Sequence, residues 1–285
     1  MAYKGQFNWK PTYSITYITG YSAVFGSLYW LIQTGNWPLY LASFLWWAIA
    51  CKLVFTTVGL HKYWAHGSFD TGPIGKFILT WGCIFCGTGS HYSWAIHHRH
   101  HHRTSDTKND IHSPIANNKL ETLFGLWIFK NREWWREKGV KTSHKDLLKD
   151  YWVRHIHRYY HYYWYALVGI TALVDWRITL LFVLQPIGLN IVLHGLNNYI
   201  SHTRLIPGNY TSFDTGDNSK NLPFWWGLLI LGEGYHHNHH ARPWDYDNAE
   251  KKGEWDVGGA IIRNFFDIHR GSRGSDYKKV QYESN

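Results

Sequence analysis

Cysteine is scarce in this sequence, and signals of secretion or of nucleic-acid recognition are absent. Three cysteines in 285 residues do not suggest a disulfide framework. Cys83 and Cys86 form a CxxC pair without a second pair, so we interpret both as small apolar side chains in a reducing compartment. The N-terminal stretch MAYKGQFNWKP lacks the charged and apolar regions of a cleavable signal peptide, so none is predicted. No nucleic-acid-binding motif is present, and we expect no nucleic-acid partner.

Charged residues are also scarce, and the basic ones outnumber the acidic ones. Only 17% of the residues are charged, and 29 Lys and Arg against 20 Asp and Glu give a formal net charge of +9. This excess favours acidic partners: an anionic membrane face, a phosphorylated substrate or an acidic protein.

Four apolar stretches are almost free of charge. Tyr13–Ile32 has none, and Trp37–Leu60 has only Lys52. Tyr159–Val174 and Ile178–Leu196 follow later in the chain. About 20 apolar residues cross a bilayer, so these stretches predict four membrane spans. We interpret Lys52 either as snorkelling to the interface or as a sign that its helix continues into water.

The links within these two pairs of spans are short and nearly free of cations. The first link is QTGN and the second is DWR, so only Arg177 among the Lys and Arg residues lies in a link. The positive-inside rule then places both termini and the polar regions on the cytosolic side. We therefore predict an all-α integral membrane protein with one domain over residues 1–270. Four spans in two hairpins would lie under a helical cytosolic cap (61–158 and 197–270), and 271–285 would be a disordered tail. A soluble helical protein is the alternative.

Histidine, by contrast, is abundant: the chain has 20, and twelve of them gather in three clusters. The first is HKYWAH, with His61 and His66; SHYSWAIHHRHHHRTSDT at 90–107 holds six; and the third is GEGYHHNHH. The pattern HxxHH places three imidazoles on one helix face, and neutral imidazole suits iron and zinc. The clusters therefore predict a metal centre. In the second cluster, 97/100/101 and 98/101/102 both satisfy HxxHH. His61 and His66 are five apart, so we expect the helix to end or bulge between them.

Together the three clusters resemble the histidine boxes of the membrane fatty acyl desaturases. In that family the first histidine of the second box is followed by Arg, as in His98–Arg99, so the resemblance selects 98/101/102. It makes His97, His100 and His237 neighbours of the ligands. NNYISH resembles the family's N-x-x-x-H pair, in which the histidine binds metal directly and the asparagine through water. The implied metal ligands are His61, His66, His98, His101, His102, Asn198, His202, His236, His239 and His240. The stretches SDT and GEGYHHNHH are similar to bacterial and cyanobacterial members.

The resemblance implies an oxygen-dependent desaturase. Two iron ions and O₂ would introduce a cis double bond, delta-9 being the family's commonest position, into a saturated acyl chain carried as acyl-CoA or acyl-lipid. Zinc can replace the iron in overexpressed protein. The chain has neither an HPGG motif nor a ferredoxin cysteine set, so ferredoxin or cytochrome b5 would supply two electrons as a separate donor.

Further expectations concern the substrate and the rival activities. Arg158 is a candidate contact for the substrate head group. Leu45, Trp46 and Ile49 share a helical face and are candidates for the floor of an acyl tunnel. A membrane di-iron hydroxylase or acetylenase is the nearest alternative, and a histidine-rich metal transporter is a more distant one.

Overall fold

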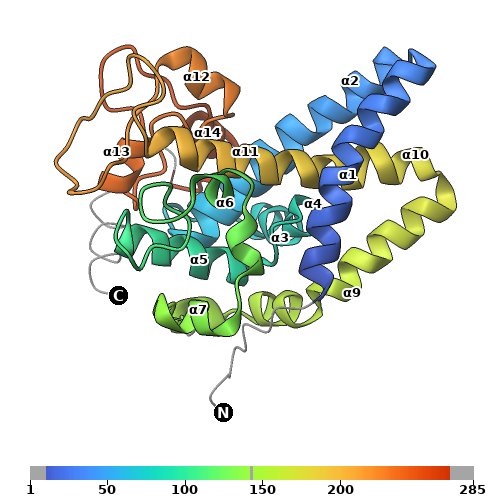
Figure 1. The fold of residues 1–285 in the computed structure, drawn as a ribbon, viewed down its shortest axis with the longest axis horizontal. Helices are drawn as coiled ribbons and strands as arrows, with labels where there is room; N and C mark the ends of the chain where they lie inside the picture. Colours follow the sequence, from blue (N-terminus) through green and yellow to red (C-terminus); the bar gives the residue numbers. More distant parts are fainter. Residues whose placement is uncertain (1–10, 142–143, 270–285) are drawn as a thin grey trace.

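The computed structural model describes residues 11–141 and 144–269, and the predicted tail lies outside them. The described residues are helical, apart from turns, loops and two isolated β-bridges, one joining Thr71 to Asp267 and the other Tyr210 to Asn221. Two long helical hairpins extend from a compact group of shorter helices (Figure 1).

The first hairpin joins α1 (Pro11–Thr34) to α2 (Trp37–Leu45). Gly35 turns the chain with a φ of 62°, a conformation that glycine adopts without strain. Asn36 then caps α2, because its side-chain oxygen accepts from the backbone N–H of Leu39. The tight turn explains why the QTGN link needs so few residues.

Helix α2 continues without a break into η1 (Trp46–Ala65), which has π-helical i→i+5 hydrogen bonding. The last of these bonds runs from the His66 N–H to the His61 carbonyl (3.2 Å). The π-helical turn brings residues five apart back to one side, which an α-helix would not do. The helix ends at Ala65, so the expected end between His61 and His66 is confirmed.

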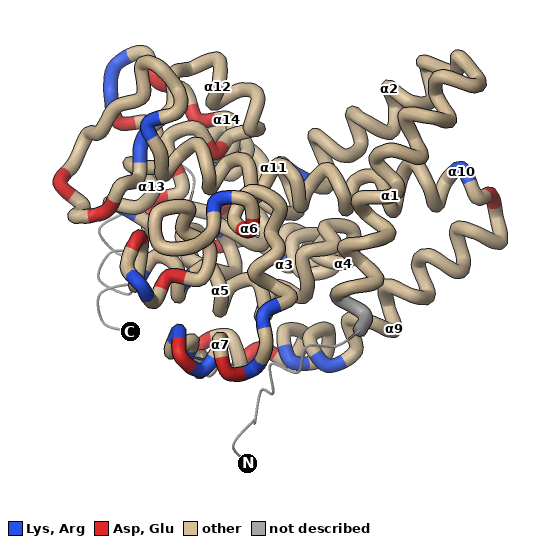
Figure 2. The backbone as a smooth tube through the Cα atoms, viewed as in Figure 1, with Lys and Arg blue, Asp and Glu red and all other residues tan. Residues whose placement is uncertain are grey.

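The second hairpin joins α9 (Tyr151–Val174) to α10 (Trp176–Ile178), η3 (Thr179–Leu184) and α11 (Gln185–Ser201), which form one continuous helical rod. Asp175 caps the rod through the backbone N–H of Arg177 and also pairs with the Arg177 guanidinium. Figure 2 shows these two charges alone at the far end of the hairpin.

Two helices of the described chain are long and apolar enough to cross a membrane, by length and composition only: Trp37–Ala65 and Trp176–Ser201. Each contains one of the predicted spans. Helices α1 and α9 contain the other two, but they do not meet the same test, so the four-span topology stays a prediction.

Glycine allows the two hairpins to pack closely where α1 meets α11. A Cβ placed on Gly188 would lie 2.2 Å from the Gly20 carbonyl oxygen, and one on Gly20 would lie 3.0 Å from the Gly188 nitrogen. Only residues without a side chain permit this backbone approach, as at many contacts between membrane helices. Figure 1 shows α1 crossing α11 at this level.

The remaining short helices form the cap. Its largest apolar cluster joins η1, α5 and α9 through Leu60, Ile96 and Ile156, all fully buried. This core fixes the end of η1 against α5, the two elements that carry the first two histidine clusters. The cap helices are α3 (Pro73–Trp81), α4 (Cys83–Cys86), α5 (His91–Thr104), α6 (Lys119–Leu123), η2 (Leu126–Phe129), α7 (Arg132–Glu137), α8 (Lys145–Lys149), α12 (Phe224–Leu229), α13 (His236–Ala241), α14 (Val257–Ile261) and η4 (Ile262–Phe266).

Candidate metal centre

Five imidazoles from three elements converge in a first group within the cap. Their ring nitrogens all lie within 4.8 Å of one another. The Nε2 atoms are 2.7 Å apart between His61 and His239, 2.8 Å between His66 and His98, 2.9 Å between His98 and His102, and 3.0 Å between His102 and His239. These nitrogens therefore point at a common centre.

A second group of four imidazoles lies directly beside the first: His101, His202, His236 and His240, with nitrogens again within 4.8 Å of one another. His202 and His236 approach through their Nε2 atoms at 3.0 Å. The Nε2 atoms of His101 and His240 are buried without a hydrogen-bond partner. The rings of His102 and His240 stack with centroids 4.3 Å apart, so the two groups share a wall.

The register of the second histidine cluster follows from helix α5. Ser90 caps this helix by accepting from the Ser93 N–H. His98 and His102 point into the first group and His101 into the second. His97 instead stacks on Trp135, with centroids 5.1 Å apart.

His100 and His237 also turn away from both groups. The His100 Nε2–H donates to the carbonyl of Asn109 (2.9 Å). His237 hydrogen-bonds Ser219 Oγ through Nδ1 (2.9 Å), and its Nε2 lies against the backbone of Phe213. The structure thus brings together nine of the ten residues that the sequence singled out.

Asn198, the tenth, lies beside the second group and holds a histidine that the sequence analysis did not list as a ligand. Its side-chain amide contacts His112 Nδ1 (2.7 Å) and donates to the His112 carbonyl. The His112 ring lies against that of His101 in a tilted arrangement, with centroids 4.2 Å apart. His101, Asp110 and His112 form a third set that could hold a cation.

Four carboxylates orient four of the nine imidazoles. Each accepts a hydrogen bond from a histidine Nδ1–H, which leaves the Nε2 lone pair facing the centre. The pairs are Glu233 with His61 (3.1 Å), Asp110 with His101 (2.8 Å), Asp106 with His202 (2.9 Å) and Asp217 with His240 (2.7 Å). The sequence analysis assigned no role to these residues. Glu233 stands in the GEG stretch and Asp106 in SDT, whereas Asp217 has no sequence signal.

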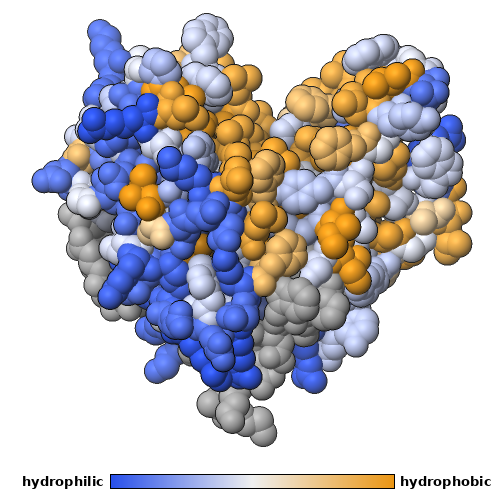
Figure 3. All heavy atoms as spheres, viewed as in Figure 1, coloured by the Kyte–Doolittle hydropathy of each residue, from blue (hydrophilic) through white to orange (hydrophobic). Residues whose placement is uncertain are grey.

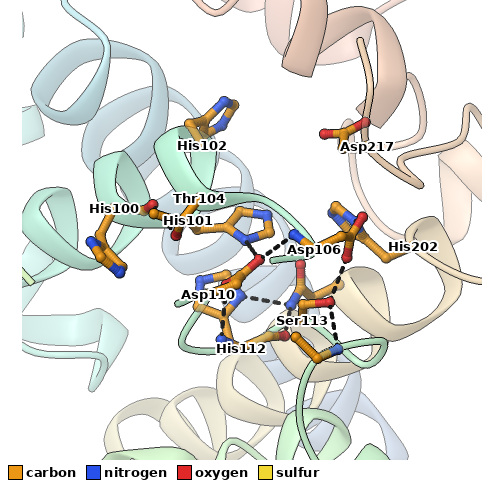
Figure 4. A network of polar contacts seen from close by, with 12 residues as sticks. His100, His101, His102, Thr104, Asp106, Asp110, His112, Ser113, His202 and Asp217 are labelled. Atoms are coloured by element: carbon orange, nitrogen blue, oxygen red, sulfur yellow. Dashed lines mark hydrogen bonds and ion pairs between the residues drawn. The ribbon is translucent and has the colours of Figure 1, made fainter. Parts of the chain in front are cut away.

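Asp106 is the hub of this network (Figure 4). Its carboxylate accepts from His202, from the Asn218 N–H (2.7 Å) and from the Ser113 hydroxyl, while its own N–H donates to Asp110 (2.9 Å). Its φ of 59° is left-handed, which aspartate tolerates better than most residues. Burial alone would raise the pKa of this carboxyl, but the His202 hydrogen bond lowers it below its usual value.

The closely spaced imidazoles of both groups are suited to binding cations. Imidazoles with Nδ1–H committed to a carboxylate present bare lone pairs, which repel at 3 Å unless a cation lies between them. The pKa values agree with neutral rings, the form that binds metal. Burial lowers the pKa well below the usual imidazole value at His66, His98, His102, His236 and His239.

Lys52 does not snorkel outward, so the first of its two interpretations is wrong. Its helix does continue beyond the predicted span, to Ala65. Lys52 is 3% exposed, and its Nζ lies 3.8 Å from Glu233 Oε1. The same carboxylate oxygen bonds His61. The charge in the second apolar stretch is therefore turned inward, toward the carboxylate that supports a histidine.

The expected tunnel floor is corrected for two of its three residues. Leu45 and Ile49 are 47% and 57% exposed, so both face outward. Trp46 is half-buried, and its indole N–H donates to the Phe182 carbonyl (3.0 Å). Leu45 and Ile49 do share a helical face, but residue spacing alone does not say whether that face turns inward or outward. The inward face there carries Trp47, Ala48 and Cys51.

Arg158 lies on the exposed surface of α9, with its guanidinium 5.4 Å from the centre of the Tyr159 ring. This position leaves it accessible, and it is compatible either with a head-group contact or with a simple interfacial cation. The cysteines match their interpretation, since Cys51, Cys83 and Cys86 are all buried free thiols.

The known proteins that this chain resembles are fatty acid desaturases. A family model described as fatty acid desaturase matches residues 16–249. Similar proteins include a chloroplastic lipid desaturase of Arabidopsis thaliana, itself assigned as probable (27% identical, covering 76% of this chain and 58% of the relative). An icosanoyl-CoA 5-desaturase of Limnanthes douglasii is 25% identical, over 80% of this chain and 63% of the relative. A delta-9 acyl-lipid desaturase of A. thaliana is 26% identical, over 79% of this chain and 73% of the relative.

The chain spans about three fifths of the length of the first two of these relatives. The family match nevertheless covers most of the present chain, including every histidine of the two groups. The chain belongs to the fatty acid desaturase family.

Proposed function

We propose that this chain is a membrane-bound, O₂-dependent fatty acyl desaturase that introduces a cis double bond, at the delta-9 position, into a saturated acyl chain. The observation that carries the proposal is the pair of adjacent histidine groups, nine buried imidazoles of which four are held by carboxylates. Two iron ions bound there would supply the oxidising power to remove two hydrogens from an unactivated methylene pair, using O₂ and two electrons.

The protein's own residues hold and orient these ions. His61, His66, His98, His102 and His239 would bind one of them. His101, His202, His236 and His240 would bind the other, with Asn198 acting through water. The carboxylates keep the Nδ1 proton on the ligand rings and so keep Nε2 free for the metal. Imidazole-rich sites accept zinc as well as iron. Metal analysis of protein purified from iron-supplemented cells would identify which ion is bound.

The acyl chain would approach past an aromatic wall beside the first group. A small cavity of about 20 Å³ there marks the start of such a path. It is bounded by Tyr17, Thr88, Trp94, Trp127 and Ile128, together with His97, His98, His112 and His194. Trp94 stacks on His98, with centroids 4.7 Å apart. A mostly apolar wall adjoining the imidazoles suits a methylene chain and excludes water from the reacting carbons.

The proposed enzyme is a multi-pass membrane protein, with both termini and the histidine groups on the cytosolic side. The near absence of charge at the far ends of both hairpins supports this orientation. Ferredoxin or cytochrome b5 would deliver the electrons, and the basic excess of the chain favours an acidic carrier.

The substrate is either an acyl-CoA or an acyl-lipid, since the similar proteins include desaturases of both classes. Arg158→Gln tests whether this residue contacts the head group of an acyl-CoA. If Arg158 binds the phosphates of a CoA head group, the variant raises KM for acyl-CoA and leaves kcat unchanged. An unchanged KM for acyl-CoA would remove Arg158 from the site.

The test of function is a fatty-acid profile by gas chromatography–mass spectrometry in a yeast that requires unsaturated fatty acids. The yeast expresses the native chain, His101→Ala, or the matched control His100→Gln from the same helix. We expect new monounsaturated chains from the native chain and from His100→Gln, and none from His101→Ala at equal protein level. Iron analysis of the purified native chain should give two ions per chain.

Other products would change or overturn the proposal. Hydroxy fatty acids would identify a hydroxylase. If neither product forms even with ferredoxin and cytochrome b5 both supplied, the proposed activity is wrong. Derivatising the double bond locates it and tests the delta-9 assignment.

A further inference from the structure

The chain between the second and third histidine clusters contains an apolar stretch that the proposed function does not use. Residues 221–232, NLPFWWGLLILG, carry no charge and are flanked by Lys220 and Glu233. Helix α12 lies within this stretch. Twelve residues are too few to cross a bilayer, and an uncharged run of this length is typical of a buried, re-entrant or interfacial segment.

Leu222 and Ile230 anchor the stretch in the cap, but helix α12 between them is not buried. Trp225 is 73% exposed and Leu229 is 66% exposed, and Phe224 and Trp226 are also exposed. No residue of α12 falls in the buried class. A contiguous exposed patch of this kind marks a surface that contacts a partner or a membrane.

The position of the stretch along η1 indicates whether a partner protein or the membrane contacts it. Leu231 packs with Trp47, Ala48 and Cys51. A Cβ on Gly232 would lie 3.5 Å from the Leu53 side chain. Residues 47–53 belong to the middle of the apolar helix Trp37–Ala65. Leu53 precedes His61 by eight residues, about two turns of the π-helical η1, so the stretch lies farther along the apolar helix than the metal groups.

The surface colouring agrees with this placement. Figure 3 shows apolar residues on both walls of the notch between the cap and the α1–α2 hairpin, and Figure 1 places α12 and α2 at its two sides. In Figure 2 the charged residues of the cap are concentrated in its outer loops and lower helices, and α12 itself is uncoloured. If η1 crosses the bilayer, lipid acyl chains would surround the apolar side chains on both walls of the notch.

We infer that α12 is an interfacial element that dips into the cytosolic leaflet and rests on lipid acyl chains. The inference depends on the membrane placement in the proposed function and adds a lipid contact outside the four spans. Two tryptophans suit the boundary between head groups and chains. Lipid is favoured over a second protein because the patch is continuous with the apolar wall of η1 and has no charged residue within it.

The lipid contact would act on the metal centre through the backbone. Gly227 of α12 meets Gly234, since a Cβ on Gly234 would lie 2.3 Å from the Gly227 Cα. The Leu222 N–H donates to the Gly234 carbonyl (2.8 Å). Both contacts are made by Gly234. Glu233 directly precedes this glycine, and only Tyr235 separates it from His236. The depth of α12 in the leaflet therefore helps to position Glu233 and the third histidine cluster.

The test uses single-cysteine labelling in lipid nanodiscs. The native thiols Cys51, Cys83 and Cys86 are fully buried, so a thiol-reactive nitrobenzoxadiazole dye on folded protein labels only an introduced cysteine. Dye is attached to Trp225→Cys or, in a second variant, to Leu229→Cys. The lipid-facing reference is Ile49→Cys, on the outer face of η1, and the water-facing reference is Lys252→Cys, on the cap. Unmutated protein treated with dye measures the background.

The readout is quenching by phosphatidylcholine brominated on its acyl chains. We expect the dyes at 225 and 229 to be quenched at least half as strongly as the dye at 49, with blue-shifted emission. Quenching no greater than at 252 overturns the inference. Blue-shifted emission without quenching also overturns it, because protein then covers the patch. If the dye at 49 is itself not quenched, the membrane placement fails together with the inference.

Discussion

Removing the charge of Asp106 is the sharpest test of how the metal centre is supported. Asp106→Asn keeps the shape of the side chain, and asparagine tolerates the left-handed φ of 59° at this position. The variant removes the ionised acceptor of the His202 Nδ1–H, the Asn218 N–H and the Ser113 hydroxyl. The asparagine amide could also donate a hydrogen bond to His202 Nδ1, which would favour the tautomer that carries its proton on Nε2.

The expected magnitude follows from the bond to His202. A hydrogen bond to a charged group contributes about 1.5–3 kcal/mol. Loss of a carboxylate that orients a metal-bound histidine lowers metal affinity or activity about 10- to 100-fold, which corresponds to roughly 1.4–2.8 kcal/mol. The two estimates agree, so we expect Asp106→Asn to weaken iron binding by about 10- to 100-fold.

The assay is iron retention against a graded chelator, together with thermal unfolding in detergent. Asp214→Asn, an exposed residue of the loop that also carries Asp217, is the control and should match the native chain. The stability difference between the native chain and Asp106→Asn should narrow after complete chelation. Equal iron retention by Asp106→Asn and the native chain would refute the argument.

The same variant predicts a pH dependence. The pKa of Asp106 is lower in the folded chain than its usual value, because the His202 hydrogen bond outweighs the effect of burial. A lowered carboxyl pKa contributes stability above the unfolded-state value of about 4, and this contribution is lost as the pH falls through the folded-state pKa. In chelated protein the difference in unfolding temperature between native and Asp106→Asn chains should therefore be largest above about pH 5 and shrink below about pH 4. A difference that grows on acidification would contradict this sign.

Two further predictions concern packing and charge in the helices. Gly188→Ala should lower the unfolding free energy by about 1–3 kcal/mol, since its Cβ would lie 2.2 Å from the Gly20 carbonyl, whereas Gly169→Ala, with open space around it, should have little effect in the same thermal assay. Lys52→Met should destabilise by roughly 3–5 kcal/mol, because it leaves the buried Glu233 carboxylate without its cation. Adding Glu233→Gln to Lys52→Met should recover part of that loss, and a double variant less stable than Lys52→Met alone would show that the pair does not interact as the structure indicates.

Much of the metal centre could be predicted from residue spacing. HxxHH places three imidazoles on one helix face, and α5 and α13 both use it. Spacing could not divide the histidines between two groups. His101 and His102 are adjacent in sequence but point into different groups, because successive residues on a helix are about 100° apart. The supporting carboxylate Asp217 had no sequence signal, since it meets His240 only after a loop folds back.

Helical class, the positions of the apolar helices and the identity of the clustered histidines were thus determined by the sequence itself, because they depend on local composition and periodicity. The tertiary structure alone decided that Lys52 turns inward to Glu233, that Leu45 and Ile49 face outward, and that nine imidazoles from four elements share two adjacent centres. These outcomes depend on how η1, α5, α11 and α13 pack against one another, which residue spacing within one helix does not determine. Contacts between residues more than a hundred positions apart, such as His102 with His239, are set by that packing and leave no trace in either local sequence.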